Sequence, residues 1–263
     1  MTPDVRSSPR ARVFITGASS GIGEALAGHY ARRGAILGLC ARRLEPLHAL
    51  AARLGGESAC YGVDVTEPQS ARAAAEDFIR QFGAPDVVIA NAGVSVGTLG
   101  EHVEDIAAFR KVMDTNVLGM AATFQPFVAQ LRARGSGTLA GIASVAGFRG
   151  LPGSGAYSAS KAAAITYLES LRAELHGSGV AVVTICPGYI RTPMTAVNRY
   201  SMPFIIDADD AARRIARAIA RRRRLAVIPW QMAIAAAVLR ILPGWLYDRL
   251  FARAPRKARN LPL

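Results

Sequence analysis

The chain has 263 residues, of which 51% are hydrophobic and 19% are charged, and it holds three cysteines. This length allows a sizeable core, and this composition excludes a disordered protein and a disulfide-stapled secreted domain. The formal net charge of +13 would suit a nucleic-acid binder, but it is unevenly distributed. Residues 1–210 hold 19 basic and 18 acidic residues, whereas residues 211–263 hold 13 basic residues and one acid, Asp248. The body is therefore nearly neutral and the tail strongly basic.

The start of the chain, MTPDVRSSPR, is polar, is interrupted by proline and lacks the apolar stretch of a signal peptide. We therefore expect a polar N-terminal extension over residues 1–10 and residence in the cytoplasm. Neither a linker nor a repeat divides the chain before residue 200, which predicts a single domain. The three cysteines are odd in number and far apart, so we expect reduced thiols, and the scattered histidines imply no metal site.

The first periodic segment is an apolar strand over residues 13–16, followed by a glycine-rich turn and a helix over residues 21–33. Glycines let the backbone turn tightly and approach a pyrophosphate, whose charge then sits at the helix N-terminus. This pattern predicts a nucleotide-binding turn. The residues that we expect there are Gly17, Ser19, Ser20, Gly21, Ile22 and Gly23.

The following segments alternate between strand and helix. Strands are predicted over residues 35–40, 58–63 and 86–90, and helices over residues 43–54 and 67–82. Such alternation is typical of an α/β fold with a doubly wound parallel sheet, the Rossmann fold. We expect it to fill residues 11–230, with a short helical C-terminal extension.

The end of the second strand is predicted to select the cofactor. Enzymes that prefer NAD place an acid there for the ribose 2′-hydroxyl, whereas those that prefer NADP offer an arginine to the 2′-phosphate. This chain reads Cys40-Ala41-Arg42-Arg43, without an acid before Glu45. Arg42 therefore favours NADP(H). The alternative is that the two arginines only begin a solvated helix in an arginine-rich chain.

Candidate catalytic residues lie between Ser144 and Lys161. Tyr157 and Lys161 are four residues apart in a helical pattern, so their side chains share one face. A nearby ammonium favours the phenolate and would make the tyrosine a usable acid or base. Ser144 follows an apolar strand-like segment, where its hydroxyl could donate to a developing oxyanion. The pair alone is common on helices, so the interpretation depends on its context.

That context is a set of five motifs that follow one another along the chain. They are TGxxxGxG at residues 16–23, NAG at residues 91–93, Asn116, Ser144, and YxxxK at residues 157–161. The set resembles the short-chain dehydrogenase/reductase family over roughly residues 11–230. The resemblance implies hydride transfer between a nicotinamide cofactor and a carbonyl or alcohol, with Tyr157 as general acid/base. It also implies that Lys161 lowers the pKa of Tyr157 and binds the ribose, and that Ser144 stabilises the oxyanion. Asn116, within a predicted helix over residues 103–134, would hold a proton-relay water.

The resemblance also assigns the remaining cofactor contacts. Asp64 and Val65 would meet the adenine, Asn91, Ala92 and Gly93 would let the ribose pass, and Pro187, Gly188, Ile190 and Thr192 would orient the nicotinamide. It further suggests a homodimer or homotetramer. The apolar loop over residues 195–206 favours a lipophilic substrate, although it could equally pack on the body.

The tail over residues 231–263 is basic and amphipathic. Its apolar segment Met232–Leu242 is too short to span a membrane, and Trp230 and Trp245 flank it as interfacial anchors would. These features predict docking on an anionic membrane surface through residues 230–259, with the protein peripheral on the cytoplasmic membrane face. The alternative is that the tail packs over the substrate pocket or joins subunits.

Together the motifs predict an NADPH-dependent carbonyl reductase or alcohol dehydrogenase acting on a lipophilic ketone or aldehyde, in lipid metabolism. Two other functions were weighed. A non-catalytic NADP-binding regulatory protein would keep the glycines but could lose the proton donor, which is present here. A nucleic-acid binder could use the basic run at residues 221–224, but no base-stacking module accompanies it. We therefore expect no nucleic-acid partner.

Overall fold

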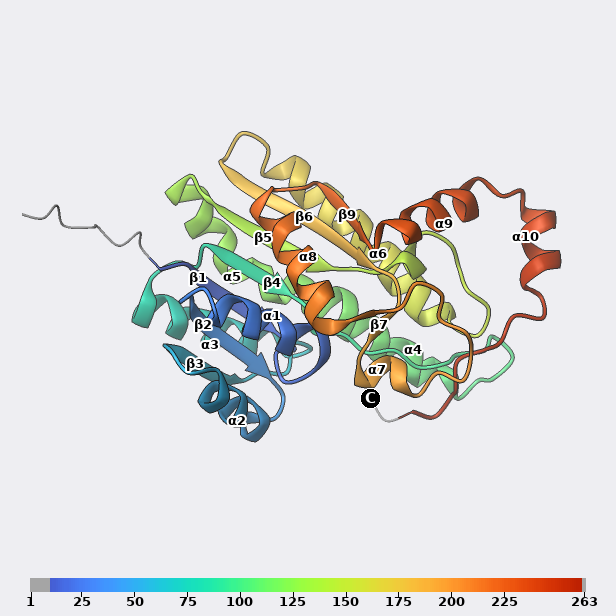
Figure 1. The fold of residues 1–263 in the computed structure, drawn as a ribbon, viewed down its shortest axis with the longest axis horizontal. Helices are drawn as coiled ribbons and strands as arrows, with labels where there is room; N and C mark the ends of the chain where they lie inside the picture. Colours follow the sequence, from blue (N-terminus) through green and yellow to red (C-terminus); the bar gives the residue numbers. More distant parts are fainter. Residues whose placement is uncertain (1–9, 262–263) are drawn as a thin grey trace, which may run out of the picture.

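A computed structural model describes residues 10–261 as a three-layer α/β structure (Figure 1). The N-terminal extension, apart from Arg10, lies outside the described residues. The central sheet has seven parallel strands in the order β3-β2-β1-β4-β5-β6-β9. Their bounds are β1 Arg12–Thr16, β2 Ile36–Ala41, β3 Ser58–Gly62, β4 Val87–Ala90, β5 Gly137–Ile142, β6 Val180–Pro187 and β9 Leu225–Ile228. A separate pair joins β7 (Ile190–Arg191) to β8 (Ile206–Asp207). The predicted doubly wound sheet is confirmed.

Helices cover both faces of this sheet. One face carries α1 (Gly21–Ala31), α2 (Leu44–Leu54) and α8 (Ala208–Ala220). The other carries α3 (Pro68–Phe82), α5 (Gly119–Arg134) and α6 (Gly155–Glu174), with α4 (Asp105–Met113) packed beside α6. The remaining helices are α7 (Pro193–Ala196), α9 (Trp230–Ile241) and α10 (Gly244–Phe251).

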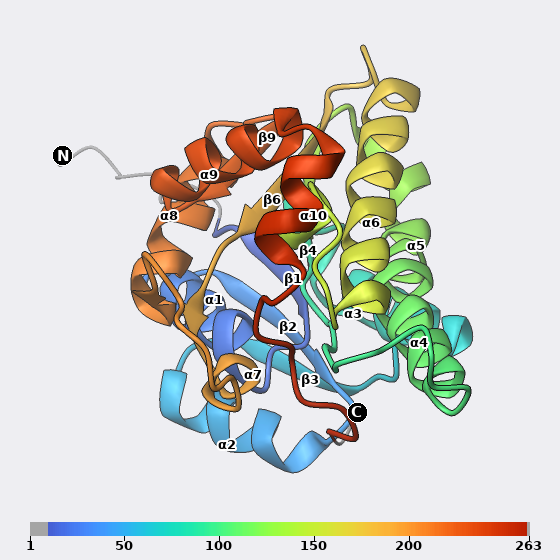
Figure 2. The same ribbon diagram turned by 90° about the vertical axis from the view of Figure 1, so that its right-hand side faces the viewer.

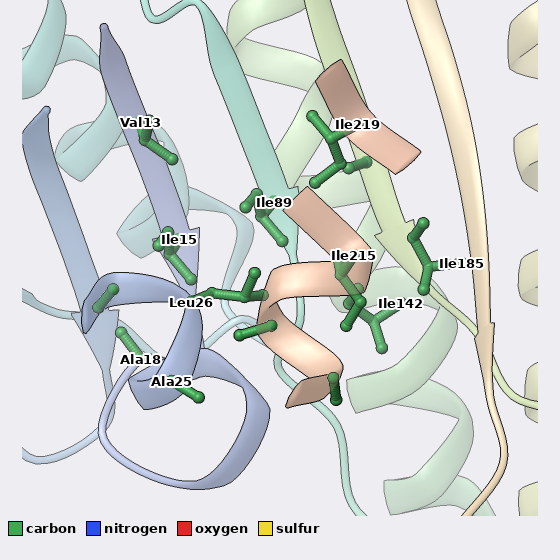
Figure 3. Packing of buried hydrophobic residues seen from close by; sticks show 14 of the residues in the cluster. Val13, Ile15, Ala18, Ala25, Leu26, Ile89, Ile142, Ile185, Ile215 and Ile219 are labelled. Carbon is green, nitrogen blue, oxygen red and sulfur yellow. The ribbon is translucent and has the colours of Figure 1, made fainter. Parts of the chain in front are cut away.

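The core follows the alternation of side chains along each strand. On β1, Val13 and Ile15 point to the α1 and α8 side, whereas Phe14 points to the other side. Figure 3 shows Ile215 and Ile219 of α8 lying over the branched side chains of the central strands. Strands buried on both faces read as continuous apolar runs, and this explains why their sequence pattern is so distinct.

One predicted helix is divided in the structure. Residues 103–134 were expected to form a single helix, but a π turn at Asp114–Leu118 separates α4 from α5. Asn116 is completely buried in this turn. Isolated π turns of this kind are frequent at functional sites because they re-aim one side chain without ending the helix.

The tail forms two helices and an extended segment. The helices α9 and α10 project beyond the carboxyl ends of the strands, and Pro243-Gly244 separates them (Figure 1). Residues 252–261, which we call the C-terminal strap, then run back along the carboxyl ends of the strands between α7 and α4 (Figure 2). No helix of residues 10–261 is long and apolar enough to cross a membrane. The division at residue 230 stays a prediction.

Candidate active site

A cleft of about 620 Å³ opens at the carboxyl ends of the strands. It spans the point where the strand order reverses between β1 and β4, which is the usual ligand site of a doubly wound sheet. Every predicted cofactor or catalytic residue lines this cleft except Gly23 and Asn116. The lining set is Gly17, Ser19, Ser20, Gly21, Ile22, Arg42, Asp64, Val65, Asn91, Ala92, Gly93, Ser144, Tyr157, Lys161, Pro187, Gly188, Ile190 and Thr192.

The glycine-rich turn depends on its glycines for conformation and for space. Gly17 has a φ of 66°, in the left-handed region that favours glycine. Gly23 lies behind the turn, where an added Cβ would approach the Gly17 carbonyl oxygen to 2.1 Å. Gly23 therefore shapes the turn from within and does not face the cleft.

Asn91 fixes this turn to the end of β4. Its side-chain Nδ2 donates to the carbonyl oxygens of Thr16 and Gly17, each at 3.1 Å. Its backbone N–H donates to the Thr16 hydroxyl at 3.2 Å. Asn91 thus joins the ends of two neighbouring strands, which is a structural role in addition to the predicted contact with the cofactor.

Positive charge gathers at the end of the cleft formed by β2 and β3. Ala41 is buried at the end of β2, and Arg42 beside it is exposed and lines the cleft. Asp64, on the neighbouring strand end, is partly buried, which by itself would raise its pKa. Hydrogen bonds from Thr66, together with Arg42 and Lys111, nevertheless hold the pKa of Asp64 below its usual value. Arg42 and Lys111 therefore both face this end.

Ser144, Tyr157 and Lys161 meet at the other end of the cleft. Ser144 follows β5 and is 8% exposed, while Tyr157 and Lys161 come from the first turns of α6. The Tyr157 and Ser144 hydroxyls are hydrogen-bonded to each other. The Lys161 Nζ lies 5.7 Å from the Tyr157 ring centroid and donates to the Ile142 carbonyl oxygen at 2.8 Å. The structure thus brings together the three residues that the sequence singled out.

Burial dominates the proton equilibria of this cluster. It raises the pKa of Tyr157 above its usual value, and the hydrogen bond with Ser144 opposes that rise. Burial also lowers the pKa of Lys161 to about 8. In this arrangement Tyr157 is a protonated phenol at neutral pH, which is the form that a proton donor needs. The sequence expectation that Lys161 lowers the pKa of Tyr157 stays a prediction.

Asn116 lies beside the cluster and binds the loop after β4. Its Oδ1 accepts the Val94 N–H at 2.8 Å, and its Nδ2 donates to the Val94 carbonyl oxygen at 3.0 Å and to the Ser160 hydroxyl at 2.9 Å. An added Cβ on Gly93 would lie 3.1 Å from Asn116 Oδ1 and 3.6 Å from Lys161 Nζ. Both amide hydrogens of Asn116 are thereby used in holding the cleft wall.

The segment after β6 closes the cleft over the turn of α1. Thr192 caps α7 in a reciprocal arrangement with Thr195, whose hydroxyl donates to the Ile190 carbonyl oxygen at 2.6 Å. The Thr192 side chain lies next to Gly21, where an added Cβ would approach its Cγ2 to 3.2 Å. These contacts set the position of the predicted nicotinamide-side residues relative to the glycine-rich turn.

Sequence reasoning missed several cleft residues. They include Val63, Thr66, Val94, Ala107, Arg110, Lys111, Asp114, Thr115, Pro193, Met194 and Thr195. Asp64-Val65-Thr66 carried a detectable signal, because an Asp two residues before Thr favours the local turn that is seen here. Arg110 and Lys111 carried no signal, because only the tertiary packing of α4 brings them to the cleft.

The cleft fits an extended dinucleotide. The glycine-rich turn at the N-terminus of α1 has no room for a Cβ, so a pyrophosphate can approach its backbone closely. Arginine and lysine side chains line the far end of the cleft. The donor and acceptor groups of Ser144, Tyr157 and Lys161 lie at the opposite end, where a reacting ring would sit.

Comparisons with known proteins agree with this geometry. The short chain dehydrogenase family model matches residues 11–202. An uncharacterized oxidoreductase of Myxococcus xanthus is 40% identical over 89% of this chain and 94% of its own length. The 11-beta-hydroxysteroid dehydrogenase 1A of Arabidopsis thaliana is 38% identical over 72% of this chain, which spans 55% of that protein. An alcohol dehydrogenase of Thermococcus sibiricus, solved with 5-hydroxy-NADP, shares the fold with a TM-score of 0.73 and 28% identity over 83% of this chain and 95% of its own.

The family match extends over most of the sheet and includes the glycine-rich turn, Asn116, Ser144, Tyr157 and Lys161. Members of this family are oxidoreductases that act on alcohol and keto groups with a nicotinamide cofactor. The chain belongs to the short-chain dehydrogenase family.

Proposed function

We propose that the protein is an NADPH-dependent carbonyl reductase, reversible in principle, which interconverts a lipophilic ketone or aldehyde and its alcohol. The observation that carries the proposal is the cluster of Ser144, Tyr157 and Lys161 at one end of a dinucleotide-shaped cleft. A non-catalytic NADP-binding protein would have no use for a proton donor that is held in this way.

Each residue of the cluster has a distinct part in the proposed reaction. Bound NADPH supplies the hydride to the carbonyl carbon. Tyr157 gives its phenolic proton to the carbonyl oxygen, and Ser144 donates a hydrogen bond to that oxygen as its negative charge develops. Lys161 stabilises the phenolate that Tyr157 becomes, and with the cofactor bound its ammonium would also hold the nicotinamide ribose. The cleft wall that Asn116 holds fixes the relative positions of these groups. A relay water beside Asn116 would return the proton to Tyr157.

The preference for NADP(H) is supported by the charge at the end of β2. Enzymes of this fold use either cofactor, and an acid at the strand end favours NAD. Here Ala41 occupies that position, while Arg42 and Arg43 line the cleft and Lys111 faces the same end. A 2′-phosphate there would meet these cations, and the acids among the described cleft residues are Asp64 and Asp114.

A lipophilic substrate is supported by the segment between α7 and β8. Met194, Val197 and Phe204 are exposed by 38%, 44% and 53%, and the rings of Tyr189 and Tyr200 lie 6.4 Å apart in an edge-on arrangement. Apolar side chains exposed beside a cleft favour an apolar ligand. The named hydroxysteroid dehydrogenase among the relatives is consistent with such a substrate.

Assembly and location belong to the same proposal. Val103, Ile106 and Leu118 are 86%, 67% and 61% exposed around α4 and the π turn, an apolar surface that suits a homodimer or homotetramer. We place the enzyme in the cytoplasm, with part of it peripheral on the inner membrane face and a role in lipid metabolism.

The test is to follow NADPH consumption with ketones and aldehydes of graded chain length, with NADH run in parallel. We expect NADPH-dependent reduction whose kcat/KM rises with the apolar length of the substrate. If NADPH binds but no carbonyl is reduced with either cofactor, the regulatory alternative is favoured instead.

A further inference from the structure

The helix α9 presents a stripe of large apolar side chains to solvent. Trp230, Ile234, Val238 and Ile241 are 63%, 57%, 51% and 81% exposed. Their spacing of four, four and three residues places them on one helical face. The inner face carries Met232 and Ala236, which are buried against the body. A surface helix normally has the reverse arrangement, with its large apolar residues turned inward.

The helix α10 also exposes apolar side chains and is held firmly in place. Trp245 and Leu250 are 70% and 60% exposed, whereas Tyr247 is buried and donates its hydroxyl to the Gly150 carbonyl oxygen. The Arg149 guanidinium stacks 4.3 Å from the Tyr247 ring centroid. It also donates to the carbonyl oxygens of Leu239 and Leu242, each at 3.0 Å. The exposed side chains therefore belong to a fixed surface and not to a loose tail.

Unpaired positive charge surrounds the apolar surface. Arg240, Arg249, Arg253 and Arg256 are all exposed, and none forms an ion pair with a carboxylate among residues 10–261. Asp248 is the single acid of residues 230–261. A second copy of the chain that docked face to face would bring the same arginines together and repel. The exposed arginines instead favour an anionic partner, and the tryptophans favour a partner with an apolar interior.

We propose that the outer face of α9 and α10 docks on an anionic phospholipid bilayer, lying in the plane of the interface without crossing it. The apolar stripe enters the acyl boundary, and the four arginines meet the lipid phosphates and carboxylates. Trp230 and Trp245, the two tryptophans of the chain, lie at the starts of α9 and α10, and tryptophan is enriched where a protein meets the membrane interface.

The docked orientation brings the substrate side of the cleft to the lipid. The C-terminal strap leaves α10 and lies on the loops that flank the catalytic cluster (Figure 2). Lys257 donates to Ser95 at 2.9 Å, Arg259 pairs with Asp105 at 2.9 Å, and the Gly97 N–H donates to the Ala258 carbonyl oxygen at 2.9 Å. The C-terminal strap approaches the Gly97 backbone so closely that a Cβ on Gly97 would lie 2.2 Å from the Lys257 carbonyl oxygen. This step rests on the proposed function: a lipophilic carbonyl compound enters the cleft from the bilayer, beside the strap.

The docking test is sedimentation of the full-length protein with vesicles of phosphatidylcholine containing phosphatidylserine, against vesicles of phosphatidylcholine alone. We expect pelleting with the anionic vesicles that weakens as salt rises. Arg249→Gln together with Arg253→Gln should lower partitioning roughly 30-fold. Ile241→Ser together with Trp245→Ser should lower it at least about tenfold. The matched control is Leu44→Ser, an exposed apolar residue at the opposite, β3 side of the sheet, which should pellet like the wild type.

Three outcomes would overturn docking: wild-type protein that stays in the supernatant at low salt, pelleting that the four substitutions leave unchanged, or substitutions that split an oligomer while vesicle binding is absent. The variants should keep wild-type reduction of a short, water-soluble ketone, which shows that they fold. Absence of any reductase activity would refute the proposed function and leave the vesicle result standing. Delivery from lipid is tested by a long-chain ketone carried in the vesicles, for which kcat/KM should fall in the docking variants while kcat/KM for the short ketone is kept.

Discussion

The side-chain amide of Asn116 binds both backbone groups of Val94. Its Oδ1 accepts the Val94 N–H at 2.8 Å and its Nδ2 donates to the Val94 carbonyl oxygen at 3.0 Å. The side-chain amide thus makes the pair of hydrogen bonds that a neighbouring strand would make with the Val94 backbone. It continues the wall of the cleft beyond the end of β4. The π turn of the helix is what brings Asn116 into this position.

Replacing Asn116 should therefore destabilise the fold more than replacing its other partner, Ser160. Asn116→Ala leaves both backbone groups of Val94 without their partner, which should lower the free energy of unfolding by about 2–4 kcal/mol. Ser160→Ala removes the hydrogen bond from the amide and the one that the Ser160 hydroxyl donates to the Tyr157 carbonyl oxygen, and it should cost about 1–2 kcal/mol. Urea titration measures both, and an Asn116→Ala protein as stable as the wild type would contradict the role of this pairing.

Tyr157→Phe should separate binding from chemistry. The substitution removes the phenolic proton and its hydrogen bond with Ser144 but keeps the ring. Loss of a positioned general acid should lower kcat at least ~100-fold. The dissociation constant for NADPH, measured by fluorescence titration, should stay close to that of the wild type. A variant that turns over within a few-fold of the wild type would show that another group donates the proton.

Arg42→Ala should weaken NADPH selectively. A charge-assisted contact to a phosphate is worth roughly 1.5–3 kcal/mol, so the affinity for NADPH should fall about tenfold to a hundredfold while that for NADH barely changes. Ala41→Asp should lower the affinity for NADPH and raise that for NADH, because a carboxylate there repels the 2′-phosphate and accepts a hydrogen bond from the 2′-hydroxyl of NADH. Equal wild-type affinities for the two cofactors would refute the assignment of Arg42.

Reductase activity should decline in alkaline solution because of Lys161. Burial lowers the pKa of Lys161 to about 8, so below that pH the side chain carries its charge and above it the charge is lost. The neutral amine no longer stabilises the phenolate left on Tyr157, so kcat/KM for reduction should fall as the pH rises through about 8. Tyr157 adds no loss in the neutral range, because its raised pKa keeps it protonated. Lys161→Met should have low activity without this inflection, and a wild-type profile with no alkaline decline would contradict the role of Lys161.

Much of the fold was predictable because its signals are local. Strands buried on both faces, such as β1 and β5, read as short apolar runs between turns. The end of α9 before Pro243-Gly244 also has a local cause, since proline and glycine interrupt a helix for reasons of backbone geometry. The π turn was not visible, because it depends on a hydrogen bond between Asn116 and a loop 22 residues earlier.

The sequence by itself determined the family, the alternation of strands and helices, and the residues of the proposed catalytic cluster. A glycine that needs a positive φ, or a tyrosine and a lysine four residues apart on a helix, is fixed by chemistry that acts over a few residues. Only the tertiary structure decided where the basic tail lies. Residues 252–261 contact the loop that holds Ser95 and Gly97 and the start of α4 at Asp105, while large apolar side chains of α9 and α10 stay exposed. Which face of an amphipathic helix is buried depends on the partner that packs against it, here Gly150, Arg149 and Gly188, and those partners lie far away in the sequence.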